Sequence, residues 1–170
     1  MAVVIAAGED SDWPGVVDIF WETSTRGTFA DINERVAFQN RYLETYRGEI
    51  VFVAKAGAEV VGYLVGVADT QAHGEILAMN PHMELFGDLY HRYPGHLHIN
   101  CTEAVRGQGV GARLLAAFEA ELGRRGVGGV HLITGATARN VGFYLKNGYT
   151  HRVERLWEGR PLLLLGKALA

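Results

Sequence analysis

Two kinds of apolar spacing divide this chain into predicted strands and helices. In residues 96–102, Leu97, Ile99 and Cys101 alternate with polar residues, which predicts a strand with one buried and one solvent-facing side. Residues 110–125 return apolar side chains at helical spacing and predict a helix. Further helices are expected at residues 10–24, 32–47 and 138–148. Further strands are expected at residues 3–7, 129–134, 149–157 and 161–169, with a hairpin over 49–69 around a Gly-Ala-Glu turn.

This order of elements indicates an α/β fold in a single domain over residues 1–170. Strands that cross over through helices imply a mixed, mostly antiparallel central sheet of about seven strands flanked by about four helices. Residues 70–95 are expected to be irregular, and a connection of that length in a small domain is usually functional or mobile.

Composition and charge narrow the class of protein. The hydrophobic content of 48% suits a folded chain, and the net charge of −3 without a Lys/Arg block predicts no nucleic-acid partner and no anionic membrane surface. The single cysteine excludes an internal disulfide and a cysteine-based zinc site, which favours the cytoplasm. We expect no signal peptide, and no apolar stretch approaches the ~20 residues of a membrane span.

A glycine-rich turn, "RGQGVGARLL", joins the strand at 96–102 to the helix at 110–125. Free N–H groups and partial positive charge at a helix start bind phosphate oxygens, and glycine lets the backbone approach the anion. A nucleotide P-loop is rejected because Ala112 and Arg113 stand where Lys-Ser/Thr is required. A dinucleotide fingerprint fits the glycine spacing poorly. A purely structural glycine turn remains open.

Two motifs together resemble the GNAT acetyltransferase superfamily. Arg106-x-x-Gly109-x-Gly111 is similar to its Gln/Arg-x-x-Gly-x-Gly/Ala signature, and "FYLKNGY" at residues 143–149 is similar to its FYxxxGF. The strand order also looks like that fold, so the resemblance covers nearly the whole chain. "YPGHLHIN" before the turn looks like bacterial relatives of the acetyltransferase-like domain of O-GlcNAcases.

The resemblance implies an acetyl-coenzyme A site. The amides of the turn would hold the pyrophosphate, the strand edge at Cys101 and Thr102 would pair with the pantetheine arm, and the Cys101 N–H would polarise the acetyl carbonyl. Tyr144 resembles the tyrosine that protonates the departing sulfur. Asn140 or Thr137 would replace the usual asparagine, since both offsets share a helix face with Tyr144. The implied turn residues are Arg106, Gly107, Gln108, Gly109, Val110, Gly111 and Ala112.

The candidate general base is His98, with His96 second. Both lie on the polar side of the predicted strand, and an imidazole titrates near neutrality. "HLH" is also similar to a His-Leu-His of arylalkylamine N-acetyltransferase. Two hydrogen-bonded cleft histidines remain an alternative. A zinc site is less favoured because it would recruit His73, His82 or His91 as a third ligand.

The acceptor side is less defined. Phe29, Asn100 and Glu103 are candidate substrate-binding residues. The aromatic and acidic residues of the linker at 25–33 and of the segment at 70–95 would suit a primary amine with an apolar part. Trp157 and the apolar tail at 161–169 predict either a homodimer edge or an ordinary core strand.

These observations favour an acetyl-CoA-dependent N-acetyltransferase. The acceptor would be an amine of a small molecule or a protein, and the acetyl group would move directly in a ternary complex. A covalent role for Cys101 is disfavoured because its apolar face predicts burial. The rival interpretation is a coenzyme A-binding sensor or scaffold without transfer activity.

Overall fold

The computed structural model describes residues 2–169, in two compact units. The first unit comprises Met1–Gly66 and His98–Ala120, and the second comprises Val67–Leu97 and Glu121–Ala170. The strand order is β1-β2-β3-β4-β5-β7-β6, which confirms the expected α/β fold with a mixed, seven-stranded sheet.

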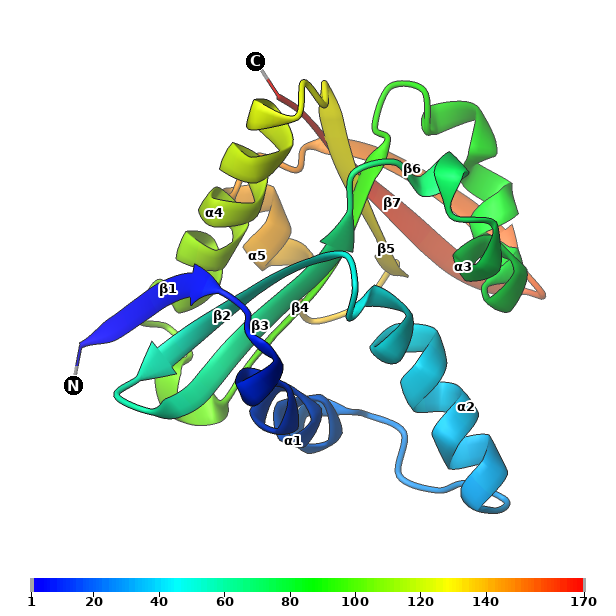
Figure 1. The fold of residues 1–170 in the computed structure, drawn as a ribbon. Helices are drawn as coiled ribbons and strands as arrows, with labels where there is room; N and C mark the ends of the chain where they lie inside the picture. Colours follow the sequence, from blue (N-terminus) through cyan, green and yellow to red (C-terminus); the bar gives the residue numbers. More distant parts are fainter. Residues whose placement is uncertain (1, 170) are drawn as a thin grey trace. The chain divides into compact units, whose positions relative to one another are not determined.

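The elements follow the predicted order closely (Figure 1). The strands are β1 (Val3–Ala7), β2 (Ile50–Ala56), β3 (Glu59–Val67), β4 (Gly95–Cys101), β5 (Gly129–Gly135), β6 (His151–Trp157) and β7 (Arg160–Ala168). The α-helices are α1 (Trp13–Thr23), α2 (Ile32–Tyr42), α3 (Gly74–Met79), α4 (Val110–Arg124) and α5 (Val141–Lys146). Short 3₁₀ helices are η1 (Asp10–Asp12), η2 (Glu44–Tyr46), η3 (Thr70–Ala72), η4 (Pro81–Leu89) and η5 (Glu103–Val105).

In the first unit, α1 packs against the hairpin of β2 and β3. The three strands β1, β2 and β3 pair antiparallel. Asp12 precedes α1 and forms an ion pair of 2.6 Å with Lys55 of β2. A Cβ at Gly15 would lie 2.9 Å from the Cβ of Val60, so glycine permits this close approach of helix and strand.

The helix expected at residues 32–47 is shorter than predicted. α2 ends at Tyr42 because Leu43 leaves the helical backbone, with φ of −136° and ψ of −62°. The following turn, η2, carries Tyr46 into the interior, where both Leu43 and Tyr46 are buried. α2 itself has no buried residue among those described. Burial of the two apolar residues after the helix therefore outweighs the helical periodicity that suggested one continuous helix.

In the second unit, β7 lies between β5 and β6 and pairs antiparallel with both. Leu163, Leu164 and Leu165 are almost fully buried. Of the two interpretations of the apolar tail, the core strand is therefore correct and the exposed dimer edge is wrong for β7. β6 is the edge strand of the described sheet, and it carries Trp157.

The prediction of an irregular segment at residues 70–95 is wrong. This segment forms η3, α3 and η4, and it buries Ile76 and Phe86 completely. Tyr90 stacks on His131 of β5 with ring centroids 4.8 Å apart. Buried aromatic residues therefore order a stretch whose prolines and lack of periodicity had suggested a loop.

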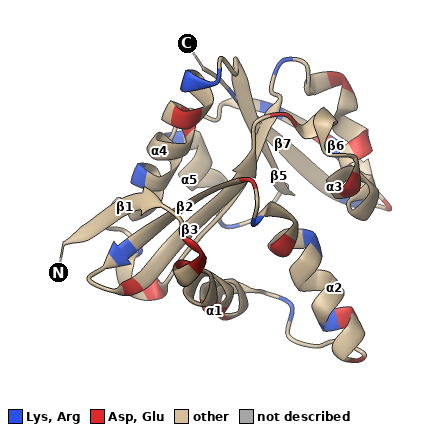
Figure 2. Cartoon of the chain, viewed as in Figure 1, with Lys and Arg blue, Asp and Glu red and all other residues tan. Residues whose placement is uncertain are grey.

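Charged side chains of both signs are spread over the helices of both units (Figure 2). Among the described residues, no helix combines the length and the apolar character that crossing a membrane requires.

The adjacent glycines Gly128 and Gly129 provide a test of packing in the second unit. A Cβ at Gly129 would lie 2.2 Å from the Arg92 carbonyl oxygen, whereas one at Gly128 would meet nothing within 4 Å. We expect Gly129→Ala to lower the free energy of unfolding by about 3 kcal/mol or more, because backbone has to move. Gly128→Ala should change it by less than about 0.5 kcal/mol. Urea denaturation measures both, and equal effects would contradict the described packing.

Candidate functional site

At the end of β4, one edge of the strand backbone faces β3 and the other edge faces away from it. The Thr102 N–H donates to the Val61 carbonyl at 2.9 Å. Because successive residues of a strand point their N–H groups to opposite sides, the Cys101 N–H is directed away from β3. Within the first unit, Cys101 thus keeps the orientation that pairing with an added chain requires. The N–H of Thr102, which was predicted to share this role, is already used.

The glycine turn has the backbone conformation that its residues suggested. Gly107 and Gly109 have φ values of +75° and +78°, which side chains rarely adopt. A Cβ at either position would meet nothing within 4 Å, so conformation rather than space requires glycine there. Gly111 differs from them, because it lies in the first turn of α4.

The N–H groups of the turn divide into two sets. Those of Arg106 and Gln108 donate to the carbonyls of Glu103 and Val105, at 3.1 and 3.3 Å, which does not fit the prediction that every amide of residues 106–112 holds phosphate. The amides of Val110, Gly111 and Ala112 open α4, and first-turn amides have no partner within their helix. These three amides and the positive end of the helix dipole are the part of the turn that could hold an anion.

His98 lies half-buried on β4 between two tyrosines of the first unit. Its Nε2 is 3.2 Å from the Tyr46 hydroxyl, and the Tyr46 ring packs edge-on against the imidazole with centroids 5.2 Å apart. The Tyr42 ring also meets the imidazole edge-on, with centroids 6.0 Å apart. Burial raises the pKa of Tyr46 far above its usual value, so this hydroxyl stays protonated at any ordinary pH.

His96 lies in the second unit and is 3% exposed, so the expectation of a solvent-facing histidine pair is wrong for this residue. The Thr70 hydroxyl lies 2.7 Å from both the Pro94 carbonyl oxygen and His96 Nδ1. Since its single proton goes to the carbonyl, His96 donates through Nδ1–H. The His96 ring also packs against His131, with centroids 5.6 Å apart. This setting favours a structural histidine over the second base that the sequence suggested.

Cys101 is half-buried, and its Sγ lies 3.0 Å from the position of a Cβ at Gly62. Burial raises the pKa of its thiol to about 11, and the nearby Arg106 offsets only part of this. A protonated thiol is a poor nucleophile at neutral pH.

Tyr144 and Asn140 belong to the second unit. Tyr144 is 5% exposed on α5 and packs edge-on against Phe143 and Tyr149. Asn140 precedes the helix, and its carbonyl oxygen Oδ1 accepts from Thr134 at 3.3 Å. Thr137 lies outside α5, so the expectation that it shares a helix face with Tyr144 is wrong.

The candidate acceptor-binding residues have different settings within the first unit. Asn100 donates through Nδ2 to the Tyr63 hydroxyl at 2.8 Å. Glu103 is exposed at the start of η5. Phe29 packs against Trp21 and Phe38, and Phe38 in turn contacts Tyr42. These aromatic rings therefore extend from Phe29 to the tyrosines that surround His98.

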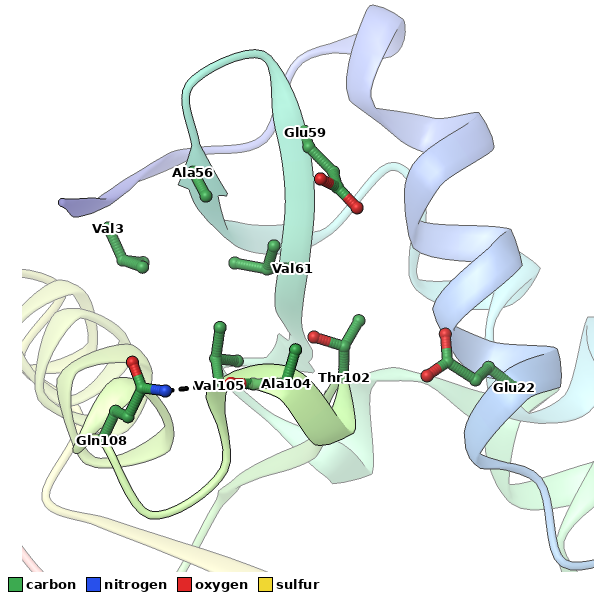
Figure 3. Close-up of a pocket in the computed structure, with 9 residues that line it drawn as sticks. All are labelled: Val3, Glu22, Ala56, Glu59, Val61, Thr102, Ala104, Val105 and Gln108. Carbon is green, nitrogen blue, oxygen red and sulfur yellow. Dashed lines mark hydrogen bonds between the residues drawn. The ribbon is translucent and has the colours of Figure 1, made fainter. Parts of the chain in front are cut away.

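A pocket of about 490 Å³ adjoins Thr102 in the first unit (Figure 3). Apolar side chains and two carboxylates line it, and Figure 3 shows Glu22 extending from α1 toward Thr102. The lining residues are Val3, Glu22, Ala56, Glu59, Val61, Thr102, Ala104, Val105 and Gln108.

Sequence reasoning missed the partners of the two β4 histidines. Tyr46 falls within the helix expected at residues 32–47, and Thr70 within the segment expected to be irregular. A tyrosine 52 positions from its histidine leaves no local signal, so only the fold could reveal this contact. Within residues 2–169, no group of three His, Cys, Asp or Glu side chains is placed to hold a metal ion.

Residues 47–151 match the family model of the acetyltransferase (GNAT) domain. The chain is 26% identical to SsHAT, whose crystal structure it matches over 100% of both chains with a TM-score of 0.78. An N-acetyltransferase from Staphylococcus aureus shares the fold at 15% identity over 100% of both chains, with a TM-score of 0.65.

A further structure, yncA from Salmonella typhimurium with its cofactor acetyl-CoA, shares the fold at 17% identity. It matches 100% of this chain and 95% of its own, with a TM-score of 0.63. No curated protein matches the chain.

The pairing of His96 with Thr70 predicts a measurable loss of stability. Thr70→Val keeps the shape of the side chain but leaves the buried His96 Nδ1–H and the Pro94 carbonyl without this partner. We expect it to lower the free energy of unfolding by about 1–3 kcal/mol. Thr70→Ser retains the hydroxyl and should cost less. Chemical denaturation compares the two, and a Val variant as stable as the Ser variant would argue against this hydrogen bond.

Proposed function

The chain belongs to the GNAT family of acetyltransferases, and on that premise we propose that it is an acetyl-CoA-dependent N-acetyltransferase acting by direct transfer to an amine. The conclusion rests chiefly on the turn between β4 and α4. In this turn, Gly107 and Gly109 have positive φ and are followed by the amides of the first turn of α4. Such a group of amides fits a phosphate group. The narrower likeness to O-GlcNAcase relatives and the cytoplasmic location belong to the same proposal.

Acetyl-coenzyme A would supply an activated thioester when bound. The amides of Val110, Gly111 and Ala112 would hold its phosphates, with Arg106 beside them. Gly107 and Gly109 would shape the turn, with Gln108 closing it through its bonds to Ala104 and Val105. The Cys101 N–H, directed away from β3, would polarise the acetyl carbonyl in the manner of an oxyanion hole.

The protons have assigned routes in this proposal. His98 takes a proton from the acceptor amine, and the Tyr144 hydroxyl gives one to the departing sulfur. Asn140 supports the cofactor from the start of α5. A direct transfer is preferred over an acyl-enzyme because the Cys101 thiol, with its raised pKa of about 11, is protonated at neutral pH.

The acceptor in this proposal is a primary amine with an apolar part. The aromatic side chains from Phe29 to Tyr42 would face its apolar portion, and Asn100 and Glu103 would offer polar contacts. The pocket beside Thr102 would also suit such an amine, because two carboxylates and several apolar side chains line it.

Replacement of Gly109 tests the cofactor site. Gly109 and Gly126 have φ values of +78° and +74°, and a Cβ at either would meet nothing within 4 Å, so alanine strains both backbones alike. We expect Gly109→Ala to weaken acetyl-CoA binding at least about tenfold, because the turn must relax out of its anion-binding shape. Calorimetric titration measures this.

Gly126→Ala, beyond the end of α4, should bind like the wild type. A wild-type protein that does not bind acetyl-CoA would mean that the glycine turn is structural. Equal affinity in the two variants would remove the turn from the site.

Replacement of Tyr144 separates an enzyme from a binding module. Tyr144→Phe should leave acetyl-CoA affinity unchanged within about threefold and lower turnover by about 10²–10⁴-fold, as expected for loss of a proton donor. Release of free thiol in the presence of a panel of primary amines measures the rate. Full turnover in the variant would exclude Tyr144 as the acid. Cofactor binding without transfer to any amine by the wild type would favour the sensor or scaffold.

A further inference from the structure

Strand β6 of the second unit forms an edge of the sheet, so within residues 2–169 one side of its backbone has no strand beside it. It pairs with β7 from His151↔Gly166 to Trp157↔Arg160 without a bulge. A regular, uncovered edge of this kind is a template for pairing with another strand. Edge strands commonly discourage such pairing with a proline or a bulge, and β6 has neither.

The direction of the β6 backbone groups follows from a hydrogen bond on the far side of β7. The N–H of Ala136, directly after β5, donates to the Pro161 carbonyl oxygen at 3.0 Å, so Pro161 directs its backbone groups toward β5. Because successive residues of a strand direct these groups to opposite sides, Leu162 directs its own toward β6, where it pairs with Arg155. By the same alternation along β6, the outward-facing N–H and C=O groups are those of Arg152, Glu154 and Leu156.

The side chains of these three residues lie on the exposed face of β6. Leu156 is 68% exposed, and Arg152 and Glu154 are exposed as well. Neither Arg152 nor Glu154 has an ion-pair partner within the described chain. On the opposite face, Arg155 does have one, because it pairs with Asp88. The outward backbone groups and the two charges without partners therefore belong to the same residues.

These charges select one way for β6 to pair with a copy of itself. Outward groups must meet outward groups, so the twofold axis of an antiparallel pair passes through one residue and matches the residues on either side of it. An axis at Arg152, Glu154 or Arg155 would set that charge against its own copy. An axis at Val153 sets Arg152 opposite Glu154 twice. Opposite charges directly across two strands stabilise the pair, and like charges weaken it.

We propose that β6 pairs antiparallel with β6 of a second copy of this chain, with the twofold axis at Val153. The backbones of Arg152 and Glu154 in opposing strands exchange N–H···O bonds, and their side chains form two ion pairs on the exposed face. The sheets of the two copies join edge to edge through the same patch on each. This inference concerns assembly and does not depend on the proposed transferase activity.

Exchange of the two charges tests the pairing. Sedimentation equilibrium of the full chain at low ionic strength should show a monomer–dimer equilibrium. Arg152→Glu or Glu154→Arg alone should raise its dissociation constant at least about tenfold, because two attractive pairs become repulsive. The two substitutions together restore both pairs in reversed order and should return the constant to within about threefold of the wild type. Arg160→Glu is the matched control, since it makes the same charge change on β7, away from the edge, and should leave the constant unchanged.

Cysteine cross-linking tests the position of the axis. With the axis at Val153, this residue and its copy form a non-hydrogen-bonded pair with Cα atoms about 4.5 Å apart, which is within disulfide range. Val153→Cys should therefore give a covalent dimer under mild oxidation. Leu156→Cys is the control. This position is well exposed but lies three residues from the axis, which places it roughly 20 Å from its copy, so it should remain a monomer on a denaturing gel.

The outcomes separate this inference from the proposed function. A chain that is monomeric at every concentration would overturn the inference, as would a dimer that withstands both single charge reversals. A folded double variant that fails to regain the dimer would overturn it too, and cross-linking at Leu156→Cys but not at Val153→Cys would exclude the axis. The proposed function would survive each of these results. A protein that binds no acetyl-CoA would overturn the proposed function and leave the β6 pairing intact.

Discussion

The hydrogen bond from the Thr102 N–H to Val61 is the interaction on which the arrangement of the first unit's site depends. It ties the last part of β4 to β3 and thereby directs the neighbouring Cys101 N–H to the opposite edge. The chain then reverses through Gly107 and Gly109 and enters α4, whose first-turn amides have no partner within the helix. An N–H directed away from β3 and a helix start that offers its amides thus follow from one strand end and one turn.

Interior polar groups give the two β4 histidines different chemistry. His96 is buried and bonds Thr70, whereas His98 is half-buried beside Tyr46. Two positions along a strand place side chains on the same face, so sequence spacing alone makes these residues equivalent. The tertiary structure buries His96 in the second unit and leaves His98 half-buried in the first unit. A neutral threonine or tyrosine hydroxyl in each case stabilises one ring orientation without adding charge.

Elements with strong periodicity could be predicted from the chain, whereas segments stabilised by distant contacts could not. The strand at β4 and the helix at α4 occur where alternation and helical spacing place them. Residues 70–95 appeared irregular because their order comes from aromatic contacts such as that between Tyr90 and His131. The early end of α2 arises likewise, because Leu43 and Tyr46 are buried by the fold rather than by the helix.

The sequence by itself determined the local chemistry of this protein: a strand, a glycine turn that needs positive φ at Gly107 and Gly109, and a helix start that offers amides. These three features depend on residues adjacent in the sequence, because each residue's backbone preference is set by its own side chain and its near neighbours. Only the tertiary structure decided which amides are already used, which histidine is buried, and that Tyr46 contacts His98. Such pairings join residues far apart in sequence, because burial and hydrogen-bond geometry are properties of the packed chain.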